Sequence, residues 1–308
     1  MGKIAFLFSG QGAQITGMGK AWIGKNAAAE AVFGQLEKYS PGLMALCFTA
    51  EKAELSKTLV TQPCLFAVDL AAAEAVKAAG IKPDMVAGFS LGEIPALAFT
   101  GMLSREEAFS LVKERAKHMH ACAEESPGSM AAIVGLSQTK IEDICRDIPD
   151  IYPVNYNCPL QTVIAGTAQA LQQAQAEVKN AGGKSITLRV SGAFHTPFMQ
   201  KAEEGLRNYL QNKPLFHPSI PLYANLTGEV YQEPYQELIA QQLSHPVHFE
   251  KTLHQMTAAG ADTFIEVGIG KTLQGFVKKT LPNAKAYAVS APEELAQVKE
   301  AILGGQSC

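Results

Sequence analysis

A serine between two glycines is the clearest chemical signal in this sequence. Residues 88–92 read Gly-Phe-Ser-Leu-Gly, follow the strand-like residues 84–87 and precede a segment typical of a helix. In a nucleophile elbow, such a serine occupies a sharp strand-to-helix turn, and flanking glycines allow close approach of the backbone. The pattern predicts that Ser90 forms a covalent acyl intermediate and that the N–H of Leu91 stabilises an oxyanion. A helix-capping serine is the alternative left open by these residues.

A reactive serine needs a base, usually a histidine within hydrogen-bond reach. Among the seven histidines, His195 has the most suggestive context. It lies in residues 191–197, Ser-Gly-Ala-Phe-His-Thr-Pro, where a strand-like segment precedes it and Thr196 and Pro197 begin a helix. This junction predicts that His195 is the general base, with a surface-loop histidine as the alternative.

Arg115 is predicted to lie on the apolar face of a helix, in the series Leu111, Arg115, Met119 and Cys122 with steps of three or four residues. An unpaired charge on that face would be costly. Arg115 therefore faces either an internal carboxylate or an anionic ligand, and a guanidinium suits bidentate recognition of a carboxylate.

A glycine-rich loop, Gly-Gln-Gly-Ala-Gln at residues 10–14, follows the first predicted strand. Ile15 stands where a dinucleotide loop has its third glycine, and the Gly-Lys-Ser/Thr ending of a phosphate-binding loop is missing. Phosphate binding is therefore not expected. A loop at this edge of a sheet can instead present a backbone N–H as a second oxyanion donor.

Composition permits an enzyme and excludes other classes. The 308 residues are 47% hydrophobic and 18% charged, which predicts a substantial core, and the net charge of −3 provides no basic footprint for nucleic acid. No apolar run is expected to approach the roughly 20 residues of a membrane span, and the N-terminal segment does not resemble a secretory signal.

Six cysteines without paired C-x-x-C spacing predict reduced thiols in a cytoplasmic protein rather than a disulfide framework or zinc site. They are Cys47, Cys64, Cys122, Cys145, Cys158 and Cys308.

Strand-like and helical segments alternate before residue 126, which predicts a parallel sheet covered by helices. From residue 128 to 188 the order becomes βαββαβ, as in a ferredoxin-like unit. The predicted fold is therefore α/β, with a large hydrolase-like domain that contains the parallel sheet and the nucleophile elbow. We expect residues 1–126 and 190–308 to form this domain and residues 127–189 to form a small ferredoxin-like subdomain inserted in it.

Over nearly its whole length, the chain resembles the malonyl-CoA:acyl carrier protein transacylases. Seven motifs occur in the order typical of that family. They are residues 10–14, residues 88–93, Arg115 with Met119, Asn155-Tyr156-Asn157, residues 192–195, Gln242-Leu243 before Pro246-Val247, and Glu266-Val267-Gly268 before Gly270-Lys271.

The resemblance implies roles for individual residues. Ser90 corresponds to the nucleophile, His195 to its base, and Gln11 and Leu91 to the backbone donors of the oxyanion hole. Arg115 corresponds to the residue that binds the malonyl carboxylate. The remaining assignments are Gln242, whose main-chain carbonyl orients the histidine, Phe194, associated with preference for malonyl over methylmalonyl groups, and Asn157, a residue near the site.

Three positions depart from the usual pattern of the family. Phe89 replaces the histidine that commonly precedes the nucleophile, so acyl selectivity or pH dependence is expected to differ. Ala116 and Ile269 stand where glycine and proline are common, and both changes are interpreted as packing.

The resemblance implies a ping-pong transferase of fatty acid biosynthesis with malonyl-CoA and acyl carrier protein as partners. No metal and no bound cofactor are expected beyond the coenzyme A thioester substrate, and no nucleic acid or membrane partner. A monomer is the expected state. Carrier proteins are acidic, so basic residues such as Lys184, Arg189 and Lys271 are candidates for docking. The alternatives are a trans-acting polyketide acyltransferase, a serine acyl hydrolase or thioesterase, and a non-catalytic docking module.

Overall fold

The computed structural model describes residues 2–190 and 192–304 and divides the chain into two compact units, each treated by itself below. Unit 1 comprises Met1–Lys113, Pro214–Tyr223 and Met256–Cys308. Unit 2 comprises Glu114–Lys213 and Ala224–Gln255.

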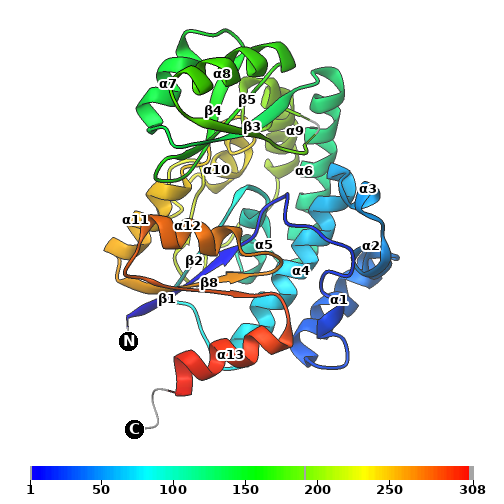
Figure 1. Cartoon of the computed structure of the whole chain (residues 1–308). Helices are drawn as coiled ribbons and strands as arrows, with labels where there is room; N and C mark the ends of the chain where they lie inside the picture. Colours follow the sequence, from blue (N-terminus) through cyan, green and yellow to red (C-terminus); the bar gives the residue numbers. More distant parts are fainter. Residues whose placement is uncertain (1, 191, 305–308) are drawn as a thin grey trace. The chain divides into compact units, whose positions relative to one another are not determined.

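A five-stranded parallel sheet forms the centre of unit 1 (Figure 1). Its strand order is β7-β2-β1-β8-β9, with bounds Leu222–Tyr223, Met85–Gly88, Lys3–Phe8, Ala261–Val267 and Lys285–Val289. In β1, every residue after Lys3 is buried, because helices cover both faces of a parallel sheet. The predicted parallel sheet is therefore confirmed.

The helices of unit 1 pack around this sheet. They are α1 (Ala27–Tyr39), α2 (Leu43–Thr49), α3 (Lys52–Leu55), α4 (Thr58–Ala78), α5 (Glu93–Phe99), α12 (Thr272–Thr280) and α13 (Pro292–Leu303), with short 3-10 helices at Lys20–Trp22 (η1) and Ser90–Gly92 (η2). Helix α6 (Arg105–Glu125) begins in unit 1 and continues into unit 2. The sequence Ser104-Arg-Glu-Glu107 predicts a capping box at its start. The structure contains it, since Ser104 Oγ accepts from Glu107 N at 3.2 Å and Glu107 Oε2 accepts from Ser104 N at 3.1 Å.

Helix α4 corrects two expectations. The sequence predicts a helix around residues 64–79, whereas α4 begins at Thr58, so Pro63 lies inside it. It is also, within the described part of the chain, the one helix that is long and apolar enough to cross a membrane by length and composition. The expectation that no apolar run approaches the length of a membrane span was therefore wrong. Of the apolar window, 83% is buried inside the structure, as in a core helix of a globular unit.

Unit 2 contains the predicted βαββαβ arrangement. The antiparallel sheet has the order β4-β5-β3-β6, with bounds Ile151–Cys158, Gln161–Gly166, Ser129–Val134 and Lys184–Thr187. Helices α7 (Gln138–Arg146) and α8 (Ala168–Asn180) lie side by side over the sheet (Figure 1). Their apolar residues share one buried cluster with β3 and β5, including Ile133, Ile141, Ile164 and Leu171.

Further helices complete unit 2 around this sheet. They are η3 (Pro197–Met199), α9 (Gln200–Leu210), α10 (Tyr235–Gln241) and the first part of α11 (Phe249–Ala258). A bridge between Asn155 and Val247 joins a flanking segment to β4, and a bridge between Pro127 and Gly192 joins the two segments that flank the βαββαβ core. Compactness thus groups more of the chain with this core than residues 127–189, and the insertion limits at 126 and 190 stay a prediction.

Several elements were not anticipated from the sequence. They are α2, α3, α10, α12, α13 and the edge strand β9. Most are short, and β9 is only partly buried, so its hydrophobic pattern is weak.

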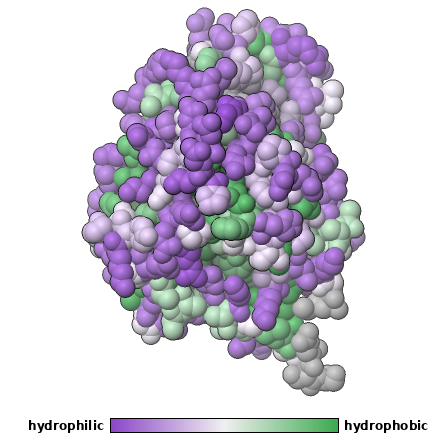
Figure 2. All heavy atoms as spheres, turned by 180° about the vertical axis from the view of Figure 1, so that it is seen from behind, coloured by the Kyte–Doolittle hydropathy of each residue, from purple (hydrophilic) through white to green (hydrophobic). Residues whose placement is uncertain are grey.

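Hydrophilic residues cover most of one face of the molecule, with small hydrophobic patches between them (Figure 2).

Candidate active site

Ser90 lies at a sharp turn directly after strand β2. Its φ of 51° places this non-glycine residue in the left-handed region, which is rare and is typical of functional sites. Ser90 is the first residue of η2, and Phe89 occupies the capping position before it. The helix-capping alternative is therefore wrong, and the half-buried serine occupies the predicted elbow.

The two glycines that flank the elbow are required by close backbone contacts. A Cβ atom at Gly88 would lie 2.0 Å from the carbonyl carbon of Gly92 and 2.1 Å from the nitrogen of Glu93. A Cβ atom at Gly92 would lie 2.2 Å from the carbonyl oxygen of Phe8. Backbone atoms cannot move away as flexible side chains do, so only glycine fits at either position.

The glycine-rich loop after β1 approaches the elbow within unit 1. A Cβ atom at Gly10 would lie 2.7 Å from the ring of Phe89 and 2.8 Å from its carbonyl oxygen. Gln11 is the next residue after Gly10 and is half-buried, while Leu91 is buried in the elbow. The loop and the elbow are thus adjacent, as two backbone donors to one oxyanion require. The donor roles of Gln11 and Leu91 stay predictions.

A buried carboxyl group supports the start of this loop. Asp69 on α4 is fully buried, and its Oδ1 accepts a hydrogen bond from Ser9 Oγ at 3.0 Å. Burial raises the pKa of Asp69 well above its ordinary value, and the charge of Glu266 raises it further. No sequence motif marks Asp69, because a single acidic residue inside an apolar helix has no characteristic neighbours.

Phe89 has a packing role within unit 1. Its ring lies 6.0 Å from the ring of Phe276 on α12, centroid to centroid, in a tilted arrangement. The same ring faces Gly10. A histidine at this position would place a polar ring against these apolar and backbone groups, which explains why phenylalanine is accommodated here.

His195 is held in a strained and buried position of unit 2. Its φ of 63° is also left-handed, and the residue is 3% exposed. Nδ1 lies 2.8 Å from the main-chain carbonyl oxygen of Gln242, and the backbone N–H donates to the carbonyl oxygen of Leu243 at 3.1 Å. Thr196 then caps η3 through Phe198 N, as predicted. The surface-loop alternative for His195 is therefore wrong.

The protonation state of His195 follows from its surroundings. A carbonyl oxygen can only accept, so Nδ1 carries the proton and Nε2 keeps its lone pair. Burial first, and the positive charge of Arg115 second, lower the pKa of His195 to about 4. The ring is therefore neutral at pH 7 and able to accept a proton through Nε2.

Arg115 is buried on the apolar face of α6, as predicted, and is 1% exposed. Its Nη2 donates to the side-chain Oε1 of Gln242 at 2.9 Å. Gln242 thus contacts Arg115 through its side chain and His195 through its main chain. The side-chain contact was not foreseen, because the two residues lie 127 positions apart. That partner is a neutral amide, so this contact adds no opposite charge to the guanidinium. The expected anionic partner of Arg115 stays a prediction.

The other predicted residues have the following positions. Phe194 is buried, and a Cβ atom at Gly192 would lie 3.1 Å from its ring. Asn157 on β4 is buried, and no described residue hydrogen-bonds its Oδ1. Lys184 and Arg189 are exposed in unit 2, whereas Lys271 of unit 1 pairs with Glu294 at 3.1 Å.

The structure therefore brings the predicted residues together in two groups. Unit 1 holds Gln11, Phe89, Ser90 and Leu91, and unit 2 holds Arg115, Phe194, His195 and Gln242.

Six cysteines were expected to be reduced thiols, and five of them belong to the described residues. The five cysteines there are free and buried, and Cys308 and Ser191 lie outside the described residues. Across residues 2–190 and 192–304, no group of three or more His, Cys, Asp or Glu side chains is placed to hold a metal ion.

The chain is similar to acyl transferases over most of its length. A family model described as "Acyl transferase domain" matches residues 5–299. The chain is 37% identical over 303 residues to a malonyl CoA-acyl carrier protein transacylase of Bacillus subtilis, covering 96% of each chain.

Solved structures show the same relationship. The crystal structure of a malonyl CoA-acyl carrier protein transacylase from Clostridium perfringens is similar with a TM-score of 0.94 and 33% identity, covering 99% of this chain and 98% of that one. A malonyl-transacylase solved with its type II polyketide synthase acyl-carrier protein is similar with a TM-score of 0.93 and 31% identity, covering 97% and 99%.

Proposed function

The chain belongs to the acyl transferase domain family, and we propose that it transfers a malonyl group from malonyl-CoA to the phosphopantetheine thiol of an acyl carrier protein. The relatives named above carry this activity in their names, and the chain spans almost their whole length. The proposal therefore covers both halves of the reaction, loading of the malonyl group and its transfer to the carrier protein.

One observation carries the proposal at the level of chemistry. Gln242 orients His195 through its carbonyl oxygen, while its side chain contacts the buried cation Arg115. A neutral histidine with its Nε2 lone pair held in one direction suits a general base. A buried guanidinium in the same group of residues suits the free carboxylate of a malonyl group. This combination has no evident use in an esterase that acts on neutral acyl groups.

In the proposed reaction, the carboxylate of malonyl-CoA pairs with Arg115. Nε2 of His195 takes the proton of Ser90, whose Oγ attacks the thioester carbonyl carbon. The N–H groups of Gln11 and Leu91 stabilise the resulting oxyanion. The C–S bond then breaks, the coenzyme A thiolate takes up a proton from His195, and malonyl-Ser90 remains.

The second half of the reaction reverses these roles. The phosphopantetheine thiol loses its proton to His195 and attacks the malonyl ester, and Ser90 recovers its proton as it leaves. These steps need proton transfer and acyl exchange only, so we assign no bound cofactor. The main-chain carbonyl of Gln242 serves where an aspartate serves in ordinary triads.

We assign acyl selectivity to Phe194 and Phe89. A buried phenyl ring at Phe194 leaves little room for an α-methyl substituent. Phe89 precedes the nucleophile and packs on Phe276, so its influence on selectivity is through the shape of the elbow.

We further propose that the enzyme works as a cytoplasmic monomer in fatty acid biosynthesis. The free, buried cysteines of the described residues suit a reducing compartment. A polyketide line is the second candidate pathway, because a similar structure is a malonyl-transacylase in complex with a polyketide carrier protein. Exposed Lys184 and Arg189 are the docking candidates for an acidic carrier of either kind. Rates of transfer to the two kinds of carrier protein separate the pathways.

Intact-mass analysis after mixing with malonyl-CoA tests the function. We expect a persistent malonyl adduct that is absent in Ser90→Ala and disappears when holo carrier protein is added. A hydrolase would instead release malonate with no lasting adduct. A docking module would bind the carrier protein without forming any adduct, and either result would contradict the proposal.

A further inference from the structure

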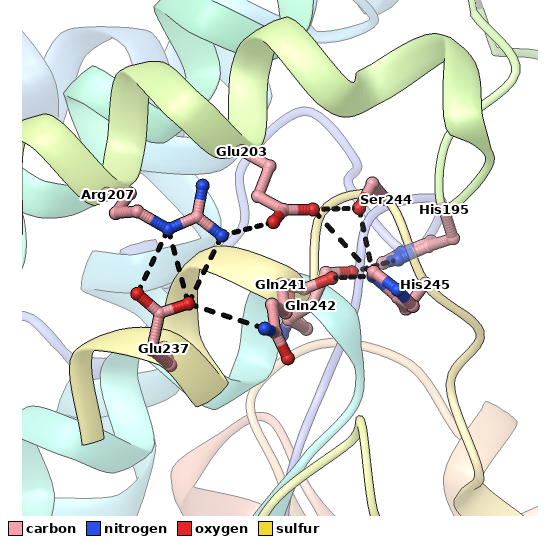
Figure 3. Close-up of polar contacts among 8 residues, drawn as sticks. All are labelled: His195, Glu203, Arg207, Glu237, Gln241, Gln242, Ser244 and His245. Carbon is pink, nitrogen blue, oxygen red and sulfur yellow. Dashed lines mark hydrogen bonds and ion pairs between the residues drawn. The ribbon is translucent and has the colours of Figure 1, made fainter. Parts of the chain in front are cut away.

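A chain of buried polar contacts connects helix α9 to the turn that orients His195 (Figure 3). Glu203 on α9 is only 8% exposed, and both of its carboxylate oxygens have partners. Oε1 accepts from Arg207 on the same helix, and Oε2 accepts from the hydroxyl of Ser244. A buried carboxylate is costly unless its oxygens are satisfied, so these two contacts hold Glu203 in one place.

Ser244 belongs to the turn at the end of α10, which contacts His195 twice. The carbonyl oxygen of Gln242 lies 2.8 Å from His195 Nδ1, and that of Leu243 accepts from the His195 N–H at 3.1 Å. Ser244 is the next residue in the chain. Anchoring its hydroxyl therefore restricts the peptide units whose carbonyl groups set the position and the ring orientation of His195.

His245 adds a second attachment of the same turn. Its Nδ1 lies 2.9 Å from both Ser244 Oγ and the carbonyl oxygen of Gln241, and 3.7 Å from Glu203 Oε2 (Figure 3). The Gln241 side chain donates to Glu237 Oε2 at 3.3 Å. Contacts from Glu203 and Glu237 thus reach the turn at both of its ends.

The pairing of Arg207 does not by itself explain Glu203. The Arg207 guanidinium already has a carboxylate partner, since its Nε and Nη2 contact Glu237 at 3.0 and 3.1 Å. The position of Oε2 on Ser244 points instead toward the turn. Neutralisation of Arg207 alone would not account for the contact between Glu203 Oε2 and the Ser244 hydroxyl.

We propose that Glu203, acting through Ser244, is a positioning residue for His195 that fixes the turn whose Gln242 carbonyl orients the base. This inference rests on the proposed function and extends it, because the neutral carbonyl of Gln242 takes the place of a charged triad member. Glu203 supplies a charged, buried anchor one step removed from the reacting atoms, and it touches no substrate.

Ser244→Ala tests the connection most directly, because it removes the hydroxyl while leaving the Glu203–Arg207 pair intact. We expect the kcat of malonyl loading to fall roughly tenfold with KM for malonyl-CoA nearly unchanged, since a small misplacement of a catalytic group slows the chemical step. In Glu203→Gln, the amide oxygen can still accept from Ser244, so we expect most of the wild-type kcat. Glu203→Ala removes the acceptor, so we expect kcat to fall as in Ser244→Ala.

The matched control is Ser185→Ala, which removes another partnered serine hydroxyl of unit 2, bound to Gln175 at 2.9 Å. We expect no change in kcat for this variant. The ¹⁵N spectrum of the His195 ring, assigned with His195→Ala, reports the tautomer directly. In Ser244→Ala, the signals should move from the pure Nδ1–H form toward a mixture of tautomers.

A lowered melting temperature of Ser244→Ala with unchanged kcat and unchanged His195 ring signals would overturn the inference, because Glu203 would then be purely structural. Failure of the proposed function is a separate result. It would appear as a wild-type protein that forms no malonyl adduct, while the ¹⁵N measurement would still decide whether Ser244 controls the His195 tautomer.

Discussion

The main-chain carbonyl oxygen of Gln242 lies 2.8 Å from Nδ1 of His195. The contact selects the tautomer that leaves Nε2 available as a base, and it does so without a second buried charge. The side chain of the same glutamine contacts Arg115 at 2.9 Å. One residue therefore relates the orientation of the base to the position of the cation.

The low pKa of His195 predicts an unusual pH profile. Burial and Arg115 lower that pKa to about 4, so the rate of Ser90 acylation should stay level from about pH 8 to about pH 5 and fall as the pH passes through about 4. In Arg115→Met, measured with acetyl-CoA, the acid limb should move to higher pH. An acid limb near pH 6.5 in the wild type would contradict the prediction.

The same pKa affects stability. The unfolded chain binds a proton at His195 near pH 6.5, whereas the folded chain binds it only near about 4. The contribution of His195 to the free energy of unfolding therefore falls as the pH drops from about 6.5 toward about 4.

Arg115→Ala should separate malonyl from acetyl transfer. Removing a buried guanidinium that pairs with a carboxylate costs several kcal/mol, so kcat/KM for malonyl-CoA should fall at least about 10²-fold. Acetyl loading should hold or rise, because acetyl has no carboxylate. Steady-state rates with both thioesters provide the measurement. Equal loss for both acyl groups would show that Arg115 is structural.

Gly88→Ala and Gly92→Ala should prevent folding of the elbow. Each Cβ would overlap backbone atoms at 2.0 and 2.2 Å, respectively, which no side-chain movement relieves. We expect a loss of several kcal/mol in urea unfolding, or no soluble protein. Gly34→Ala in α1 is the matched control. A Cβ there has no atom within 4 Å, and alanine should stabilise the helix by about 0.5–1 kcal/mol. Normal stability of Gly88→Ala would mean that the elbow is differently built.

Asp69→Asn should stabilise the protein at neutral pH. Burial raises the pKa of Asp69 well above 3.8, so the folded state holds a proton that the unfolded state releases, and stability falls as the pH rises above about 4. Asparagine keeps an oxygen acceptor for Ser9 and cannot ionise. Melting temperatures should exceed the wild-type values at pH 8, with the difference shrinking toward pH 4. A destabilised variant at both pH values would show that the carboxyl form itself is needed.

Phe89→His introduces the residue that is usual before the nucleophile. The imidazole loses apolar contact with Phe276 and gains a polar group to satisfy, so we expect a loss of about 1 kcal/mol in stability. The acid limb of Ser90 acylation should stay where His195 sets it. A limb displaced toward pH 6.5 would instead assign the histidine at position 89 a part in proton transfer.

Local patterns predicted much of this protein correctly. The βαββαβ order and the capping box at Ser104 agree with expectation. These features depend on residues close together in the chain, so periodicity and turn chemistry suffice to find them. α4 begins at Thr58 rather than near residue 64, and burial of the residues around Pro63 outweighs the hydrogen bond that the proline removes from the helix.

The sequence alone determined the chemistry that this protein can offer: a serine that needs glycine neighbours, a histidine at an element junction and an arginine on an apolar helix face. Only the tertiary structure decided how those groups are held. Gln242 contacts His195, which lies 47 positions away in the chain, and Arg115, which lies 127 positions away. Glu203 contacts Ser244, which lies 41 positions away. Contacts of this kind leave no local pattern, because they arise from the packing of distant helices and turns around shared buried atoms.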